Sequence, residues 1–170
     1  GMAVSGKETL IWQNRRGLES ANTPAKMVDA YCNALGDVFD ACIADLPMPS
    51  VGESGLPEPL KQRLDAVIRQ VRTPYLKYFL SLDVRPILAD ISCPVLALNG
   101  SKDMQVEPET NLGALRSGLT NNPKAVIEAV EGVNHLFQHC ATGSSTEYRE
   151  IEETIAPEVL DRIVRWLSEL

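Results

Sequence analysis

Residues 93–135 constrain the fold more than any other part of this 170-residue chain. Pro94 can open a strand but cannot occupy its middle. Residues 95–98, Val-Leu-Ala-Leu, form a short apolar run without alternation, which is typical of a parallel strand buried on both faces. An Asn-Gly turn signal follows, so Asp103 comes just after the carboxyl end of this strand. Open α/β sheets bind their ligands at that end, and Asp103 is therefore a candidate site residue.

A helix and a second strand follow in the sequence. Residues 108–119 begin with Pro and Glu and place three leucines at spacings of three and four, which predicts one apolar face of a helix. An Asn-Asn-Pro break precedes residues 125–130, which predict a second strand, parallel to the first and reached through a right-handed crossover. His135 lies in the loop beyond that strand. Because adjacent parallel strands end at one edge of the sheet, we expect the carboxylate of Asp103 to hold the Nδ1 hydrogen of His135.

Two segments around these residues resemble a known family. Residues 94–103, Pro-Val-Leu-Ala-Leu-Asn-Gly-Ser-Lys-Asp, and residues 132–138, Gly-Val-Asn-His-Leu-Phe-Gln, are similar to the last two catalytic segments of α/β-hydrolases of the carboxylesterase-like branch. In that family the acid and then the histidine follow the nucleophile along the chain. The resemblance covers about residues 5–170 and implies that Asp103 is the acid and His135 the general base.

The resemblance also implies a domain organisation. Residues 1–170 would form a single partial α/β-hydrolase domain, mostly helical with a small parallel sheet. About residues 5–90 would correspond to the helical cap, and about residues 91–170 to the last two strands with their helices. The closing helix, from residue 157 on, has an apolar side that we expect to cover the strands. The residues on that side are Val159, Leu160, Ile163, Val164 and Leu167.

The nucleophile of the family has no counterpart in the sequence. The family's serine sits in a Gly-x-Ser-x-Gly elbow between a strand and a helix, and the nearest string here is Gly-Glu-Ser-Gly at residues 52–55, which we interpret as a loop. An acid and a base without a nucleophile cannot carry out acyl transfer, and the elbow's contribution to the oxyanion hole is absent as well. We therefore expect a truncated hydrolase, related to serine carboxylesterases and inactive alone. The alternatives are a natural non-catalytic binding or assembly protein derived from a hydrolase, and a substitute nucleophile at Ser5, Ser101 or Cys140.

Other reactive or aromatic side chains have simpler interpretations. The cysteines show neither a close pair nor zinc-finger spacing, which predicts free, buried thiols at Cys32, Cys42, Cys93 and Cys140. A zinc site formed by His135, His139 and Cys140 beside Asp103 is a less favoured alternative, and we expect no metal and no cofactor. The aromatic side chains at Tyr75, Tyr78 and Phe79 have helical spacing, which favours a place in the core over a place in an acyl pocket.

Composition and charge limit the partners. The net charge of -7 and the pI of about 4.9 argue against binding to nucleic acid or to an anionic membrane surface. No signal-peptide pattern is present, and no apolar run approaches the roughly 20 residues that span a bilayer, so we expect a cytoplasmic protein. The first strand would keep an open edge, which favours either a homo-oligomer through strand edges or helical faces, or pairing with a missing amino-terminal half.

Overall fold

The computed structural model describes residues 2–170, which fall into two compact units. Ser5–Asp83 form a helical unit, and residues 2–4 join residues 84–170 in a unit that contains the sheet. The boundary lies a few residues before the one expected near residue 90. The reason is that a short 3-10 helix, η2 (Arg85–Asp90), packs against a helix of the sheet unit.

The helical unit is built around one central helix. Its elements are α1 (Gly6–Ser20), α2 (Ala25–Ile43), the 3-10 turn η1 (Val51–Ser54), α3 (Glu58–Val71) and α4 (Pro74–Ser81). Helix α2 contacts the other three α-helices of this unit, α1, α3 and α4, and its inward side chains Tyr31, Leu35 and Val38 are fully buried. The periodicity of the sequence predicts these helices because one side of each is apolar every three or four residues.

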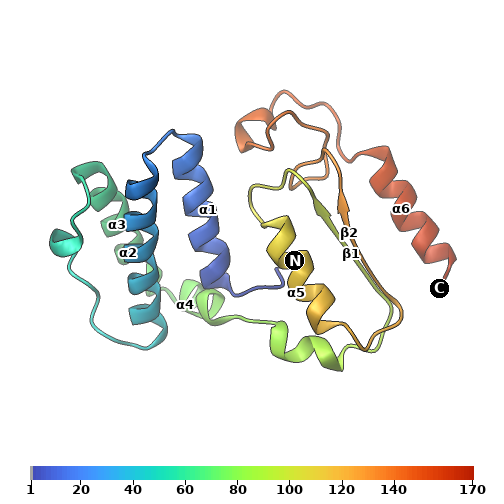
Figure 1. The fold of residues 1–170 in the computed structure, drawn as a ribbon, viewed down its shortest axis with the longest axis horizontal. Helices are drawn as coiled ribbons and strands as arrows, with labels where there is room; N and C mark the ends of the chain where they lie inside the picture. The colour runs from blue at the N-terminus through green and yellow to red at the C-terminus, as the bar shows by residue number, and fades with distance from the viewer. Residues whose placement is uncertain (1) are drawn as a thin grey trace. The chain divides into compact units, whose positions relative to one another are not determined.

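The sheet unit contains two parallel strands. Strand β1 (Val95–Gly100) pairs with β2 (Ala125–Val130), in a register that runs from Val95 opposite Ala125 to Gly100 opposite Val130. Helix α5 (Pro108–Gly118) is the crossover between them, and α6 (Pro157–Ser168) follows the second strand. Figure 1 shows α5 and α6 on opposite sides of the two strands. The expected fold, mostly helical with a small parallel sheet, is confirmed for the described residues.

The predicted burial of β1 is wrong. Residues 95–98 are only half-buried, because β2 is the only strand that pairs with β1 among residues 2–170. One edge of β1 therefore has no strand beside it in the part of the chain that the structure describes.

The apolar side of α6 is also more exposed than predicted. Val159 is buried, at 1% exposure, but Val164 and Leu167 are 62% and 56% exposed. We name the exposed side chains Leu160, Ile163, Val164 and Leu167 the α6 stripe. They follow the i, i+3, i+4, i+7 spacing of one helix face, so the sheet covers only part of the apolar surface of α6.

Several other side chains depart from the predicted core. Tyr75 and Tyr78 on α4 are 72% and 68% exposed, so the prediction that they are core residues is wrong. All four cysteines are free, and Cys32 and Cys42 are buried as predicted, whereas Cys93 is exposed and Cys140 is partly exposed. Cys93 precedes β1 in a connecting segment, where no element covers it.

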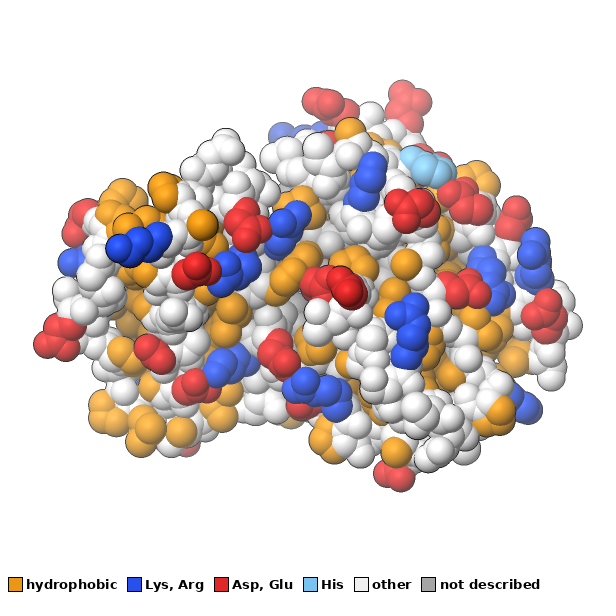
Figure 2. Space-filling view, viewed as in Figure 1, with side chains coloured by type: hydrophobic (Ala, Val, Ile, Leu, Met, Phe, Trp, Pro, Cys, Tyr) orange, Lys and Arg blue, Asp and Glu red, His pale blue; other side chains and the backbone are white. Residues whose placement is uncertain are grey.

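Two surface properties concern possible partners. None of the described helices has the length and apolar character needed to cross a bilayer. On the face drawn in Figure 2, acidic and basic side chains are interspersed over the surface and form no large patch of one sign.

Candidate functional site

Asp103 lies in the loop that follows β1. Its main-chain N–H donates to Gly100 O at 3.1 Å, which closes a tight turn. Its carboxylate oxygen Oδ1 accepts hydrogen bonds from the main-chain N–H groups of Gln105 at 2.7 Å and Val106 at 2.9 Å. The side chain is almost fully buried, at 4% exposure. A buried carboxylate needs such donors, because burial without them would strongly disfavour its charge.

His135 lies in the loop that follows β2, and Asn134 fixes the conformation of that loop. Asn134 is completely buried, and its Oδ1 accepts from the main-chain N–H groups of Leu136 at 2.8 Å and Gln138 at 3.1 Å. Its Nδ2 donates to Gln138 Oε1 at 3.1 Å. Phe137 adopts a left-handed φ of 59°, which is uncommon for a residue other than glycine. Several hydrogen bonds of Asn134 therefore hold this loop in a conformation that includes the left-handed residue Phe137.

The two loops bring the predicted pair together. His135 Nδ1 lies 2.9 Å from Asp103 Oδ2, and the predicted contact between these side chains is thereby confirmed. Because a carboxylate accepts hydrogen bonds, this contact favours the tautomer in which Nδ1 carries the hydrogen. Nε2 has no hydrogen-bond partner among residues 2–170, and the imidazole side chain is 35% exposed. The arrangement leaves Nε2 able to accept a proton while the carboxylate stabilises the resulting imidazolium.

A small hollow adjoins the pair. It has a volume of about 60 Å³ and is lined by Leu98, Asn99, Asp103, Val106, His135 and Phe137. Since pockets for small-molecule ligands span about 300 to 1,000 Å³, these residues do not by themselves form an acyl pocket.

None of the candidate substitute nucleophiles bonds to His135. Ser101 Oγ donates to Glu131 Oε1 at 3.1 Å and accepts from the Gly132 N–H at 2.8 Å. Ser5 caps α1 in a capping box. The Cys140 thiol lies 3.7 Å from Gly132 O, and burial raises its pKa, which disfavours the reactive thiolate.

The string Gly-Glu-Ser-Gly at residues 52–55 is not a nucleophile elbow. No strand precedes it, and Val51–Ser54 form a 3-10 turn rather than the predicted plain loop. Ser54 Oγ donates to Val51 O at 2.7 Å within this turn. A nucleophile elbow requires a strand that leads into a helix, and this segment lacks the strand.

His139 forms a separate cluster that sequence patterns did not reveal. Its Nδ1 lies 3.1 Å from Glu153 Oε2, and its Nε2 lies 2.8 Å from Glu158 Oε1. The hydrogen bond to Glu153 is the main cause that raises the pKa of His139. Within residues 2–170 no three His, Cys, Asp or Glu side chains converge as a metal site, so the structure does not assemble the zinc alternative built on His135, His139 and Cys140.

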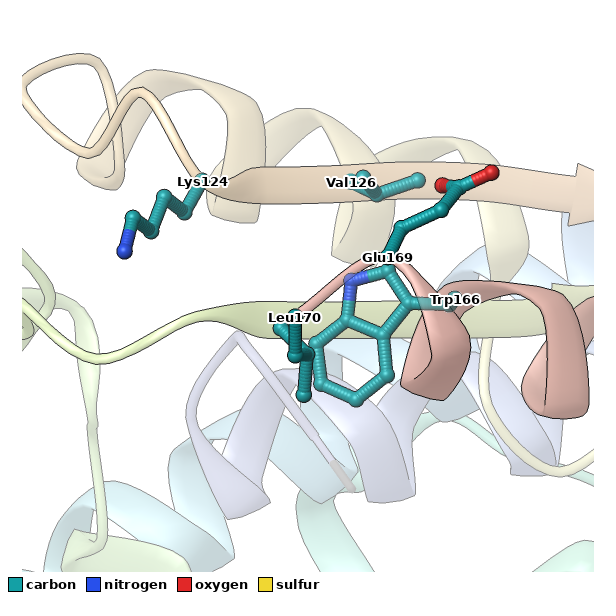
Figure 3. A pocket seen from close by; sticks show the side chains of 5 residues that line it. All are labelled: Lys124, Val126, Trp166, Glu169 and Leu170. Atoms are coloured by element: carbon teal, nitrogen blue, oxygen red, sulfur yellow. The ribbon is translucent and has the colours of Figure 1, made fainter.

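A second hollow lies at the other end of the sheet. It measures about 190 Å³ and is lined by Lys124, Val126, Trp166, Glu169 and Leu170. Figure 3 shows the Trp166 ring and Leu170 from the end of α6, with Lys124 and Val126 at the start of β2. Asp103 and His135 follow the opposite, carboxyl ends of the strands, so this hollow is separate from the candidate site.

Comparison with known proteins adds no further constraint. No family model, curated protein or solved structure matches the chain. The candidate site therefore depends on the geometry of Asp103 and His135 and on the motifs around them.

Proposed function

We propose that Asp103 and His135 are the acid and the general base of a serine hydrolase related to carboxylesterases. The observation that carries this proposal is the 2.9 Å contact between Asp103 Oδ2 and His135 Nδ1, made by a buried carboxylate to an imidazole whose Nε2 has no hydrogen-bond partner among residues 2–170. The serine nucleophile comes from a segment other than those described, and the chain is inactive without it.

Each residue has a defined step in this chemistry. His135 Nε2 removes the proton from the serine hydroxyl as its oxygen attacks the ester carbonyl carbon, and Asp103 stabilises the imidazolium that forms. The imidazolium then gives its proton to the departing alkoxide, which leaves an acyl-serine. Water then attacks the acyl carbonyl carbon while His135 removes a proton from it. The imidazolium returns this proton to the serine oxygen as the acyl bond breaks, which releases the carboxylic acid and restores the serine hydroxyl.

The open edge of β1 is the place where such a segment would join. A strand added there in parallel would end at the same edge of the sheet as Asp103 and His135, because the carboxyl ends of parallel strands coincide. A serine in the turn after that strand would lie at the same edge of the sheet as His135. The half-buried apolar side chains of residues 95–98 support this assignment, since a flanking strand and its helix would cover them.

The test begins with the isolated chain. We expect negligible hydrolysis of short acyl p-nitrophenyl esters and no labelling by a fluorophosphonate probe. Stoichiometric labelling of any serine of this chain would instead establish an internal nucleophile and would contradict the proposal.

The second arm adds the nucleophile. The chain is co-expressed with the polypeptide encoded directly upstream, provided that this polypeptide contains Gly-x-Ser-x-Gly after a strand. We expect ester hydrolysis by the purified complex, reduced at least about 10³-fold by His135→Ala or Asp103→Asn. His139→Ala is the matched control, because it removes the other imidazole and only exposed ion pairs. Equal activity in the His135→Ala complex would exclude His135 as the base.

A second candidate function is that of a non-catalytic binding or assembly protein. The α6 stripe favours it, because contiguous exposed apolar side chains mark interaction surfaces more often than scattered ones do. In this case two copies associate through the stripe or through the open edges of β1, the latter forming a four-stranded sheet about a two-fold axis. Sedimentation at micromolar concentration would then give twice the 18.6 kDa mass of the chain. An upstream polypeptide without a nucleophile elbow would favour this function over the first.

A further inference from the structure

Asn99 is a buried polar residue beside the candidate site. It is the next-to-last residue of β1 and only 7% exposed. Its Nδ2 donates to Asp103 Oδ2 at 3.0 Å, and lies 3.4 Å from both Val106 O and Gly100 O. From the sequence, Asn99 is merely part of an Asn-Gly turn signal. In the structure its strongest contact is with the carboxylate that holds His135.

The hydrogen bonds to Asp103 can be counted in full. An ionised carboxylate has about four acceptor positions, two on each oxygen. Oδ1 accepts from the main-chain N–H groups of Gln105 and Val106, and Oδ2 accepts from His135 Nδ1 and Asn99 Nδ2. Asn99 is thus the donor that shares one oxygen with the imidazole. Its hydrogen bond takes one lone pair of Oδ2 and thereby directs the other lone pair of Oδ2 toward His135 Nδ1.

We propose that Asn99 is a positioning residue, which orients Asp103 Oδ2 toward His135 Nδ1 and so selects the Nδ1–H tautomer of His135. The importance of Asn99 for catalysis rests on the proposed function, whereas its effect on the tautomer of His135 does not depend on that function. Without the amide of Asn99, the carboxylate remains bonded to the loop through Oδ1 and can rotate, so that Oδ2 is no longer held in line with the imidazole.

A structural alternative is that the amide of Asn99 only ties the loop to the strand through Val106 O. The distances favour the first interpretation, since the contact with Oδ2 is shorter and its acceptor is a carboxylate oxygen. Asn122 provides a matched comparison. It is equally buried, at 8% exposure, and its Nδ2 donates only to the main-chain oxygens of Ile91 and Cys93, at 2.9 Å each.

The test compares Asn99→Leu with Asn122→Leu. Each substitution replaces a buried amide by an apolar side chain of similar size. The ¹⁵N chemical shifts of the His135 ring, measured at about pH 8.5, where an ordinary imidazole is neutral, report which nitrogen carries the hydrogen. We expect the Nδ1–H tautomer to dominate in the unaltered protein and in Asn122→Leu. In Asn99→Leu we expect the ratio of Nδ1–H to Nε2–H to fall by roughly threefold or more. An unchanged ratio in a folded Asn99→Leu protein would overturn the proposal.

A second measurement does not require that Asn99→Leu folds. In the unaltered protein, the Nδ2 protons of Asn99 should exchange slowly with solvent. In Asp103→Asn the chemical shifts of these protons should change, whereas those of the Asn122 Nδ2 protons should stay the same. Insensitivity of the Asn99 protons to Asp103→Asn would equally overturn the proposal. Neither measurement depends on ester hydrolysis. The role of Asn99 can therefore be tested even if no esterase activity is detected.

Discussion

Replacement of Asn134 by Ala tests whether the His135 loop is as rigid as its hydrogen bonds suggest. The substitution removes two hydrogen bonds to main-chain N–H groups, at 2.8 and 3.1 Å, and one to the Gln138 side chain at 3.1 Å. At about 1 kcal/mol net for each bond, the loss is about 3 kcal/mol. Water that enters the space would reduce this value, and buried N–H groups left without a partner would increase it. We therefore expect a loss of about 2–4 kcal/mol in the free energy of unfolding.

The assay has to isolate the sheet unit. The chain contains two tryptophans, and Trp166 belongs to the sheet unit whereas Trp12 belongs to the helical unit. In a Trp12→Phe background, urea unfolding followed by tryptophan fluorescence reports the unit that carries the site. Asn134→Asp is the control, because it keeps the acceptor for both N–H groups and should lose less stability than Asn134→Ala. A loss below about 1 kcal/mol for Asn134→Ala would refute the view that this side chain holds the loop.

Three further results are expected. The His139 cluster should protect its loop most strongly between about pH 4.5 and 6.5, seen as slow hydrogen exchange of the His139 amide, which donates to Glu153 Oε2 at 2.7 Å. Because the pKa of His139 is raised, its contribution to the stability of the loop is complete below the ordinary histidine pKa and is lost as pH rises through the raised value. Because the pKa of Glu153 is lowered, its contribution is complete above the ordinary glutamate pKa and is lost as pH falls through the lowered value. Equal exchange rates at pH 5.5 and 9, after correction for the intrinsic rate, would contradict this expectation. Gly100→Ala should destabilise the sheet unit by about 1–3 kcal/mol in the same urea assay, since an added Cβ would lie 2.4 Å from Val133 O. Val164→Lys should change the free energy of unfolding by no more than about 0.5 kcal/mol, because this side chain is 62% exposed. If the α6 stripe forms a dimer interface, the same substitution should reduce the mass in sedimentation to the 18.6 kDa of the single chain, and a dimer that persists would exclude the stripe.

The sequence was most informative where structure depends on local signals. The strands and the crossover helix are predicted because apolar runs, leucine spacing and Asn, Gly and Pro breaks are all local features. The contact between Asp103 and His135 is predicted for a different reason. Two parallel strands in one sheet must end at the same edge, so topology alone brings the two loops together.

The errors concern burial, which is not a local property. The i, i+3, i+4 pattern of α6 is the same whether another element covers the helix or not, and the exposure of Val164 depends on what packs beside it. For the same reason the apolar run in β1 predicts a covered strand, although β2 is the only strand that pairs with it among the described residues. The role of Asn99 could not be inferred either, because Asn-Gly after a strand has an adequate local explanation as a turn.

The proposed acid and base, Asp103 and His135, and the groups that hold them together all lie within the sheet unit. All four donors to the Asp103 carboxylate come from residues 99–135, and the turn that fixes the imidazole comes from residues 134–138. The contact between Asp103 and His135 is therefore held by residues of this unit alone. If the proposed function holds, a joining strand would need to supply only the serine and the oxyanion donors. In that case two roles can be tested separately by mutation: substitutions in the β1 edge should change association with the proposed nucleophile segment, whereas substitutions at Asp103, His135 or Asn99 should change the chemistry of a complex that still forms.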